Sequence, residues 1–149
     1  GRFENGPRAL GNRSILADPR DPVAMNRLSR HVKMRAPFRP YACSLTFENS
    51  SRLFEIPPSS DLHGWRWMSS THRVKESGRN LVPMAWENPR FHRLLSDWSA
   101  ASGTPALLNT SFNESGFPMI SSPTDALLMF LRVDIDTLVL NDTIIRKRV

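Results

Sequence analysis

The stretch over residues 88–108 reads NPRFHRLLSDWSAASGTPALL and predicts a helix followed by a buried strand. Asn88 is a preferred N-cap residue, Pro89 suits the first helical position, and Gly103 is suited to end the helix. The apolar run at residues 106–108 is short and bounded by turn residues, which is typical of a strand buried in a core. Between the caps, apolar residues recur at helical spacing, at Phe91, Leu94, Leu95 and Trp98.

The same signals, followed outward along the chain, predict alternating helices and strands. Asp21 and Pro22 open a helix that runs to about residue 33, and Ser122 opens another, with Pro123, through residue 131. These elements predict an α/β (α+β) fold, with an open, twisted, mostly mixed β-sheet flanked by helices. Strands are expected over residues 13–17, 39–47, 81–85, 106–108, 136–140 and 143–146, the last two as a hairpin, and a long irregular stretch with one short helix near Leu53 over residues 50–79.

Length and composition indicate one globular domain over residues 1–149. Of the 149 residues, 40% are hydrophobic, and the longest apolar run, residues 126–131, is far shorter than the roughly 20 residues of a membrane helix. The single cysteine, Cys43, cannot form an internal disulfide, so we expect a cytoplasmic protein, and from the short apolar runs we expect no membrane association. Because the chain opens at Gly1 rather than at a methionine, we also expect a fragment of a longer, two-domain polypeptide.

The charge balance favours anionic partners. Lys and Arg number 20 against 14 Asp and Glu, which leaves a net charge of +6, and most of the basic residues are arginines. The planar arginine fork matches carboxylate and phosphate oxygens, so small phosphate-bearing molecules and nucleic acid are both compatible with this composition. Three polar loops are candidates for the place where such an anion binds.

The first loop, GPRALGNRS at residues 6–14, combines two glycines with Arg8, Arg13 and Ser14. Glycines let the backbone approach a ligand closely, and a loop of this kind suits phosphate. An ordinary turn with exposed arginines is the alternative. The chain contains neither a GxxxxGK[ST] nor a GxGxxG motif, so a standard nucleotide-binding motif is absent from the sequence.

The second loop, KMRAPFRPYA at residues 33–42, places Lys33, Arg35 and Arg39 at the junction of a helix and a strand. On an extended segment Lys33 and Arg35 point to the same side, so both are placed to reach one triphosphate or acyl phosphate. The alternative is a solvated helix C-terminus, where the helix dipole favours cations anyway.

The third loop, NTSFNESG at residues 109–116, follows the buried strand and offers carboxamides and hydroxyls. These groups donate and accept hydrogen bonds, which suits a carbamoyl group, a ribose or a base edge, and backbone amides can hold a phosphate. An Asx-rich turn that satisfies its own backbone is the alternative. The polar side chains of interest are those of Asn109, Thr110, Ser111 and Asn113.

The sequence offers little for metal binding or nucleophilic catalysis. The four histidines show no metal-ligand spacing and Cys43 has no pattern around it, so we expect no metal site formed by the chain. No nucleophilic triad is indicated. The histidines are His31, His63, His72 and His92.

All three loops, in this order, resemble the C-terminal region of the NodU/CmcH family of O-carbamoyltransferases. The family's segments stand here as GRFENGPRALGNRSILADPR at residues 1–20, KMRAPFRP at residues 33–40, and LLNTSFNESGFP at residues 107–118 followed by SPTDAL. The second segment and TSFNESG also resemble two motifs of YrdC proteins. The match runs from Gly1 to about Asp142.

The resemblance implies a YrdC-like domain that binds ATP, with Mg²⁺, and carbamoyl phosphate, and that joins them into carbamoyl adenylate. It also implies a partner domain, N-terminal in the same chain, which is metal-dependent and resembles the ASKHA-type fold. That domain passes the carbamoyl group to a hydroxyl of a sugar, antibiotic or related metabolite.

At the matching positions, the resemblance assigns Lys33, Arg35 and Arg13 to phosphate contact as the catalytic residues. Fixed cations stabilise the negative charge that develops on the phosphates, and a carbamate, already an oxyanion, needs no general base. The family's Asp-Gly-Thr-x-Arg-x-Gln segment is not recognisable between Met68 and Leu81, and Arg79, at about the right distance before Asn88-Pro89, is expected to serve as its arginine. The other expected nucleotide- and carbamoyl-phosphate-binding residues are Arg8, Ser14, Arg39, Arg79, Asn109, Thr110, Ser111 and Asn113.

Two other functions are alternatives, and the first of them would use the same positive charge. One is an RNA- or nucleotide-binding module of this fold without catalytic activity, and the other is a degenerate interaction domain. A nucleic-acid surface interleaves aromatic residues with Arg and Lys in a stripe, and only Trp65 and Trp67 hint at one here. The sequence therefore favours the carbamoyltransferase domain over a nucleic-acid partner.

Overall fold

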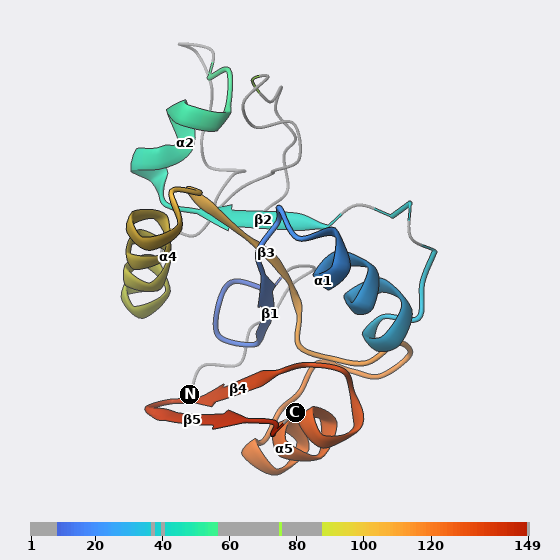
Figure 1. The fold of residues 1–149 in the computed structure, drawn as a ribbon. Coiled ribbons are helices and arrows are strands. Elements are labelled where there is room, and N and C mark those ends of the chain that lie inside the picture. Colours follow the sequence, from blue (N-terminus) through green and yellow to red (C-terminus); the bar gives the residue numbers. More distant parts are fainter. Residues whose placement is uncertain (1–8, 37, 40, 57–74, 76–87, 149) are drawn as a thin grey trace.

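The structure is a computed structural model that describes residues 9–36, 38–39, 41–56, 75 and 88–148. Figure 1 shows a small sheet with helices around it and a separate hairpin beside the last helix. The elements are β1 (Ser14–Ala17), α1 (Pro22–Arg27), a π-helix (Leu28–Val32), β2 (Ala42–Leu45), α2 (Phe47–Leu53), α4 (Pro89–Ser102), β3 (Ala106–Ser111), α5 (Pro123–Arg132), β4 (Thr137–Leu140) and β5 (Thr143–Arg146).

β3 is the centre of a three-stranded sheet with the order β1-β3-β2. Both pairings are antiparallel, with Ile15 of β1 opposite Thr110 and Cys43 of β2 opposite Leu108. α4 and α1 lie on opposite sides of this sheet, and β4 and β5 pair as an antiparallel hairpin near α5 (Figure 1). The expected α/β fold, with an open sheet flanked by helices, is confirmed, and its described pairings are all antiparallel.

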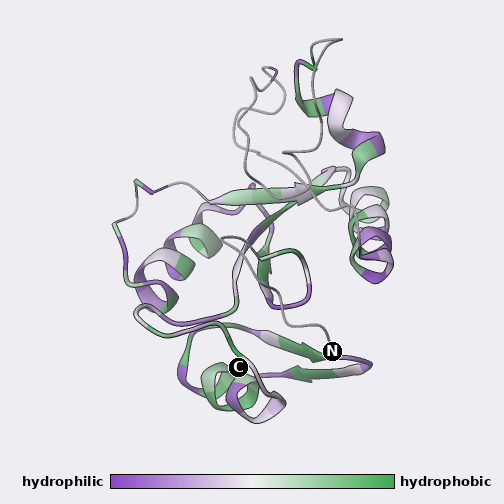
Figure 2. Ribbon diagram, turned by 180° about the vertical axis from the view of Figure 1, so that it is seen from behind, coloured by the Kyte–Doolittle hydropathy of each residue, from purple (hydrophilic) through white to green (hydrophobic). Residues whose placement is uncertain are grey.

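Alternation along β3 divides the core between the two faces of the sheet, because successive side chains of a strand point to opposite faces. Leu107 packs with Phe91 and Leu95 of α4 on one face. Ala106 and Leu108 belong to the larger cluster on the other face. Figure 2 shows the hydrophobic residues concentrated in the strands and on one side of the helices. Burial on both faces explains why residues 106–108 are continuously apolar.

The predicted helix boundaries are confirmed where a side chain caps the helix. Asn88 accepts a hydrogen bond from the backbone N–H of Phe91 at 3.1 Å, and Gly103 ends α4 in the left-handed region at φ 72°. Asp21 accepts from two amides at the start of α1, and Ser122 caps α5 in the same way. The short helix expected near Leu53 is α2.

Three predicted elements differ from the structure. The helix that begins at Pro22 changes after Arg27 to a π-helix, the strand expected over residues 39–47 is confined to Ala42–Leu45, and β3 extends beyond Leu108 to Ser111. The polar residues after Leu108 remain in the strand because β1 pairs with all three of them and β2 pairs with Asn109. The strand expected over residues 81–85 lies outside the described residues. Among the described residues, no helix has the length and hydropathy needed to cross a membrane.

Candidate anion-binding pocket

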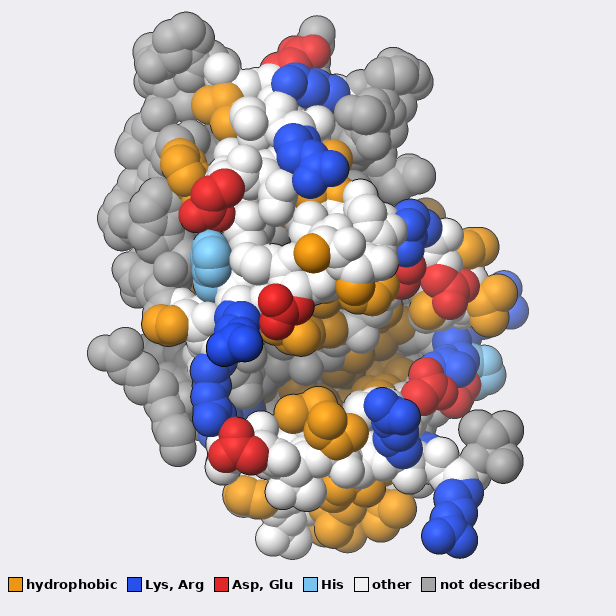
Figure 3. All heavy atoms as spheres, turned by 60° about the vertical axis from the view of Figure 1, so that its left-hand side comes forward, with side chains coloured by type: hydrophobic (Ala, Val, Ile, Leu, Met, Phe, Trp, Pro, Cys, Tyr) orange, Lys and Arg blue, Asp and Glu red, His pale blue; other side chains and the backbone are white. Residues whose placement is uncertain are grey.

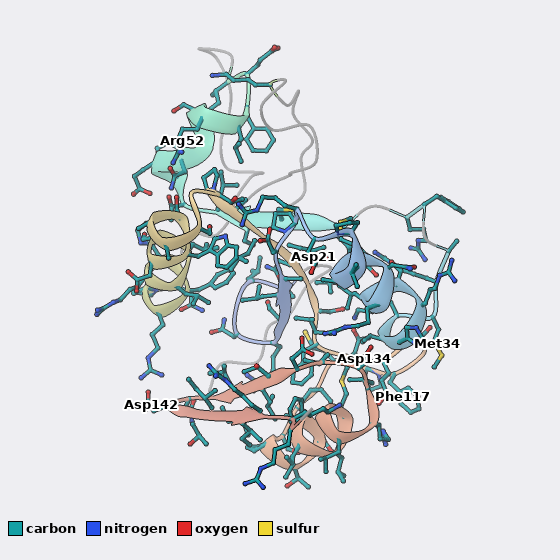
Figure 4. The ribbon with its side chains drawn as sticks, in the orientation of Figure 1. Asp21, Met34, Arg52, Phe117, Asp134 and Asp142 are labelled. Atoms are coloured by element: carbon teal, nitrogen blue, oxygen red, sulfur yellow. The ribbon has the colours of Figure 1, made fainter. Side chains whose placement is uncertain are left out.

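Two of the three polar loops meet at an open pocket of about 520 Å³. One wall is formed by residues 33–36 and Arg39, which follow the π-helix, and the other is the end of β3 with the loop at residues 113–116. In Figure 4, Met34 and Phe117, which mark these two segments, lie on the same side of the molecule. Six predicted site residues line the pocket: Lys33, Arg35, Arg39, Thr110, Ser111 and Asn113.

The first wall is built by a sharp turn of the chain. The π-helix is closed by a bond from the Lys33 amide to the Leu28 carbonyl at 2.9 Å, and the Arg35 amide donates to the Ser29 carbonyl at 3.0 Å. Between them Met34 adopts a φ of +42°, in the left-handed region that non-glycine residues rarely occupy. Lys33 and Arg35 therefore share a pocket because the chain turns at Met34, and the extended segment assumed from the sequence is wrong. Both features, a π-helical turn and a left-handed residue, recur at functional sites.

The second wall is a loop that holds its own shape. The Asn113 amide group donates through Nδ2 to the Phe117 carbonyl at 2.7 Å. The Phe117 amide closes a turn on the Glu114 carbonyl at 3.3 Å, with Gly116 at φ 77°. A positive φ at the third residue of a turn is the type II geometry that glycine supplies without steric cost. The alternative for this loop, polar side chains that satisfy its own backbone, is thus partly present within the pocket wall.

Lys33 joins the two walls. Its Nζ lies 2.6 Å from the Ser111 carbonyl, 3.2 Å from Ser111 Oγ, 2.9 Å from the Asn113 carbonyl and 2.7 Å from Asn113 Oδ1. The residue is only 8% exposed. Ser111 Oγ also donates to Asn113 Oδ1 at 2.6 Å, so these three side chains form one polar cluster.

Burial within this cluster is the main reason why the pKa of Lys33 falls from 10.5 to about 8, and the positive charge of Arg35 contributes in the same direction. The four surrounding oxygens favour the ammonium form. At neutral pH, Lys33 is therefore a charged donor that becomes neutral at mildly alkaline pH.

The arginines lie differently. The Arg35 guanidinium stacks over the Tyr41 ring, 3.9 Å from its centroid, in a cation–π contact. Tyr41 is buried and its hydroxyl bonds to Ser29 Oγ at 3.0 Å, which fixes the ring under the guanidinium. Arg39 is exposed and lines the same pocket. Tyr41 was not expected as a site residue, although it directly follows the Arg39-Pro40 pair in the sequence.

Three predicted residues are placed away from the pocket walls. Arg13 donates through Nε to the Ile120 carbonyl at 3.1 Å, and Ser14 Oγ accepts from the Gly11 amide at 3.0 Å. Asn109 is 2% exposed, and its Nδ2 donates to the Ala9 carbonyl at 3.0 Å and to Ser44 Oγ at 2.8 Å. These contacts tie loops and strands together. Arg8 and Arg79 lie outside the described residues.

Among the charged residues of the pocket wall, Glu114 was not predicted from the sequence. Glu114 lines the wall, and its Oε1 accepts two bonds from Arg132 of α5, at 2.6 Å from Nη2 and 3.1 Å from Nε. Arg132 thus counters a carboxylate that would otherwise repel an anion. Glu114 and Arg132 are far apart in the sequence and meet because of the way α5 packs, so no local sequence pattern predicts the pair. In the described part of the chain, no three His, Cys, Asp or Glu side chains gather as a metal site.

An α/β domain that faces an open pocket with one lysine, two arginines, hydroxyls and a carboxamide has the donor set of a polyanion-binding protein. Over residues 1–147 the chain matches the family model described as the carbamoyltransferase C-terminus. The chain belongs to this family, and the resemblance to the C-terminal region of the NodU/CmcH carbamoyltransferases is confirmed.

Curated relatives agree with this family. The chain is 38% identical to nodulation protein NolNO of Sinorhizobium fredii, over 99% of this chain and 24% of that protein. It is 34% identical to the 3'-hydroxymethylcephem-O-carbamoyltransferase of Streptomyces clavuligerus, over 99% of this chain and 29% of that protein. The protein of that name from Amycolatopsis lactamdurans is 33% identical over 96% of this chain and 29% of its own length. The chain therefore spans less than a third of these relatives.

Proposed function

We propose that the pocket between residues 33–39 and 110–116 binds ATP, with Mg²⁺, and carbamoyl phosphate, and joins them into carbamoyl adenylate. The observation that carries the proposal is the meeting of Lys33, Arg35 and Arg39 with the hydroxyls and carboxamide at the end of β3. Because the chain belongs to the carbamoyltransferase C-terminus family, we take the transferred group to be a carbamoyl group.

The proposed reaction has two steps. Water first cleaves carbamoyl phosphate to carbamate and inorganic phosphate. A carbamate oxygen then attacks the α-phosphorus of ATP, the bond from that phosphorus to the bridging oxygen breaks, and pyrophosphate leaves with the bonding electrons. Because the nucleophile is already an anion, the pocket needs fixed positive charge and orientation rather than a base.

Arg35 and Arg39 are placed to counter the phosphate charge, and the stacking on Tyr41 keeps the Arg35 guanidinium in one orientation. The Thr110 hydroxyl lines the same wall and is available to the nucleotide or carbamoyl group. Mg²⁺ that binds with ATP would neutralise phosphate charge. Glu114 is the carboxylate in the pocket wall, and carboxylate oxygens are ligands that Mg²⁺ prefers. Arg8, Arg13, Ser14, Arg79 and Asn109 remain predictions as ligand contacts.

The second half of the proposed activity belongs to another part of the polypeptide. The matched relatives are more than three times the length of the chain, and two of them are named for carbamoyl transfer to a hydroxymethylcephem. We therefore propose that an N-terminal, metal-dependent domain transfers the carbamoyl group to a hydroxyl acceptor. Use of ATP is compatible with the cytoplasmic location predicted from the sequence.

Calorimetric titration tests the binding part of the proposal. ATP with Mg²⁺ should bind one to one, and Arg35→Ala should weaken it by about 1.5–3 kcal/mol, the usual worth of a hydrogen bond to a charged group. Arg30→Ala is the matched control, because Arg30 is an exposed arginine of the adjoining π-helix that does not line the pocket. Equal affinities for both variants and the unmodified protein would overturn the assignment of this pocket.

A further inference from the structure

The Lys33 ammonium has more acceptors around it than it has protons to donate. An ammonium carries three N–H donors, whereas four oxygens of Ser111 and Asn113 lie between 2.6 and 3.2 Å from Nζ. The residue is 8% exposed. A phosphate that contacted this nitrogen directly would have to displace bonds that hold the pocket wall together.

Those bonds reach both the backbone and the side chains of the opposite wall. Lys33 contacts the carbonyls of Ser111 and Asn113, which flank Phe112 at the point where β3 ends and the loop begins. Asn113, held by Lys33 through Oδ1, in turn donates to the Phe117 carbonyl. One ammonium therefore fixes the path of the chain from the end of the strand to the end of the turn.

We infer that Lys33 is a positioning residue: its ammonium holds residues 111–117 in the shape that forms one wall of the pocket, and Arg35 and Arg39 are the cations that meet a bound phosphate. The first part stands on the contacts alone. The second part rests on the proposed function.

Hydrogen exchange without ligand tests the first part. In Lys33→Met, the amides of Phe112, Asn113, Phe117 and Ile120 should exchange about tenfold faster or more, because each is bonded within this loop and its attachments. In Arg35→Met they should keep the rates of the unmodified protein. The matched control is Lys147→Met, which removes a partly buried lysine whose Nζ donates to the Val133 carbonyl, away from the pocket.

Hydrogen exchange of the loop measured at a series of pH values tests whether the titration of Lys33 matters, because a residue without a titrating group would give no pH-dependent change. The charged groups that share the pocket with Lys33 are Arg35, Arg39 and Glu114. Opening of the loop returns Lys33 to water and to its ordinary pKa, so loop exchange in the unmodified protein, corrected for its intrinsic pH dependence, should slow as the pH rises from about 8 toward 10.5, and Lys33→Met should show no such change. Should Lys33→Met not fold, Asn113→Ala removes an acceptor on the other side of the same cluster and should give the same faster exchange.

Binding of ATP with Mg²⁺ at increasing salt tests the second part. A direct contact between a cation and a phosphate makes the affinity for ATP depend on ionic strength. Arg35→Met should therefore flatten this salt dependence. Lys33→Met should lower the affinity and leave the salt dependence unchanged. The inference is overturned if Lys33→Met and Asn113→Ala leave loop exchange unchanged, or if Lys33→Met flattens the salt dependence as Arg35→Met does. A protein that binds neither ATP nor carbamoyl phosphate would refute the proposed function, and the exchange data would still decide the role of Lys33.

Discussion

Gly11 lets the loop before β1 lie directly against α4. Its φ is +97°, and a Cβ built on it would lie 2.3 Å from Cδ1 of Phe91, which is 3% exposed. Asn12 Oδ1, the next residue, accepts a bond from Asn88 Nδ2 at 2.9 Å. In the described part of this loop, residues 9–14, the contacts are therefore structural ones that hold it to α4 and β3.

Gly11→Ala should destabilise the protein by about 1–3 kcal/mol, because the new methyl group meets a packed ring and the backbone is strained. Gly103→Ala is the control, since Gly103 has a φ of +72° and nothing within 4 Å of its Cβ position. Urea unfolding of both variants measures the difference. A loss for Gly11→Ala no larger than that for Gly103→Ala would contradict the close packing.

Lys33 makes stability depend on pH in a definite direction. Its pKa is about 8 in the folded protein against 10.5 for an ordinary lysine, so the unfolded chain binds more protons between these values. The free energy of unfolding contributed by this residue therefore rises from pH 8 to pH 10.5.

Unfolding of the unmodified protein and of Lys33→Met across this range should show the rise in the first and lack it in the second. Parallel curves for the two proteins would mean that Lys33 titrates in the folded protein as it does in water.

At the scale of elements, capping residues explain why helix ends were predictable. Asn88, Asp21 and Ser122 are side chains that satisfy the amides of their own first turn, and this information is entirely local. The π-helix and the extension of β3 were not predictable in this way. The extension of β3 depends on its pairing with β1 and β2, which are far away in the sequence, and Ser29 of the π-helix bonds to Tyr41, which lies beyond that helix.

Ser122→Ala should destabilise the protein by about 0.5–2 kcal/mol through loss of the α5 cap. Ser122 Oγ accepts from the Asp125 amide at 3.1 Å and donates to Asp125 Oδ2 at 2.6 Å. Ser121→Ala is a matched control, because Ser121 makes only a 3.4 Å contact with the same carboxylate. Thermal unfolding that ranks Ser121→Ala as the more damaging change would contradict this cap.

The candidate site shows the same division between local and long-range information. The residue types of the two pocket walls, and their meeting, followed from the loops and the family resemblance. The cluster around Lys33, the Glu114–Arg132 pair and the stacking of Arg35 on Tyr41 did not, because each depends on tertiary packing. The burial of Asn109 was also hidden, since a polar residue after an apolar run reads as the start of a loop.

At the scale of the whole molecule, the face drawn in Figure 3 shows the charge of its described residues distributed rather than gathered. On the face in Figure 3, Lys and Arg side chains are interspersed with Asp and Glu, and hydrophobic side chains group at the lower end, where the hairpin and α5 lie. Among the described residues, Arg90 forms an ion pair with Asp142, and Arg93 forms one with Asp97. Such a face lacks the continuous basic stripe of a nucleic-acid surface.

RNA binding should accordingly be weak and without a defined stoichiometry. A fluorescently labelled single-stranded RNA, titrated at physiological salt, should bind far more weakly than ATP with Mg²⁺ does, and Arg35→Ala should leave it unchanged. Saturable RNA binding tighter than that of ATP would favour the alternative of a nucleic-acid module.

Release of pyrophosphate decides whether this pocket activates a carbamoyl group, as proposed. The protein should release pyrophosphate from ATP and Mg²⁺ only when carbamoyl phosphate is present, with the rate lost in Arg35→Ala and retained in Arg30→Ala. Absence of pyrophosphate from folded protein that binds both ligands, or equal release by both variants, would contradict this proposal.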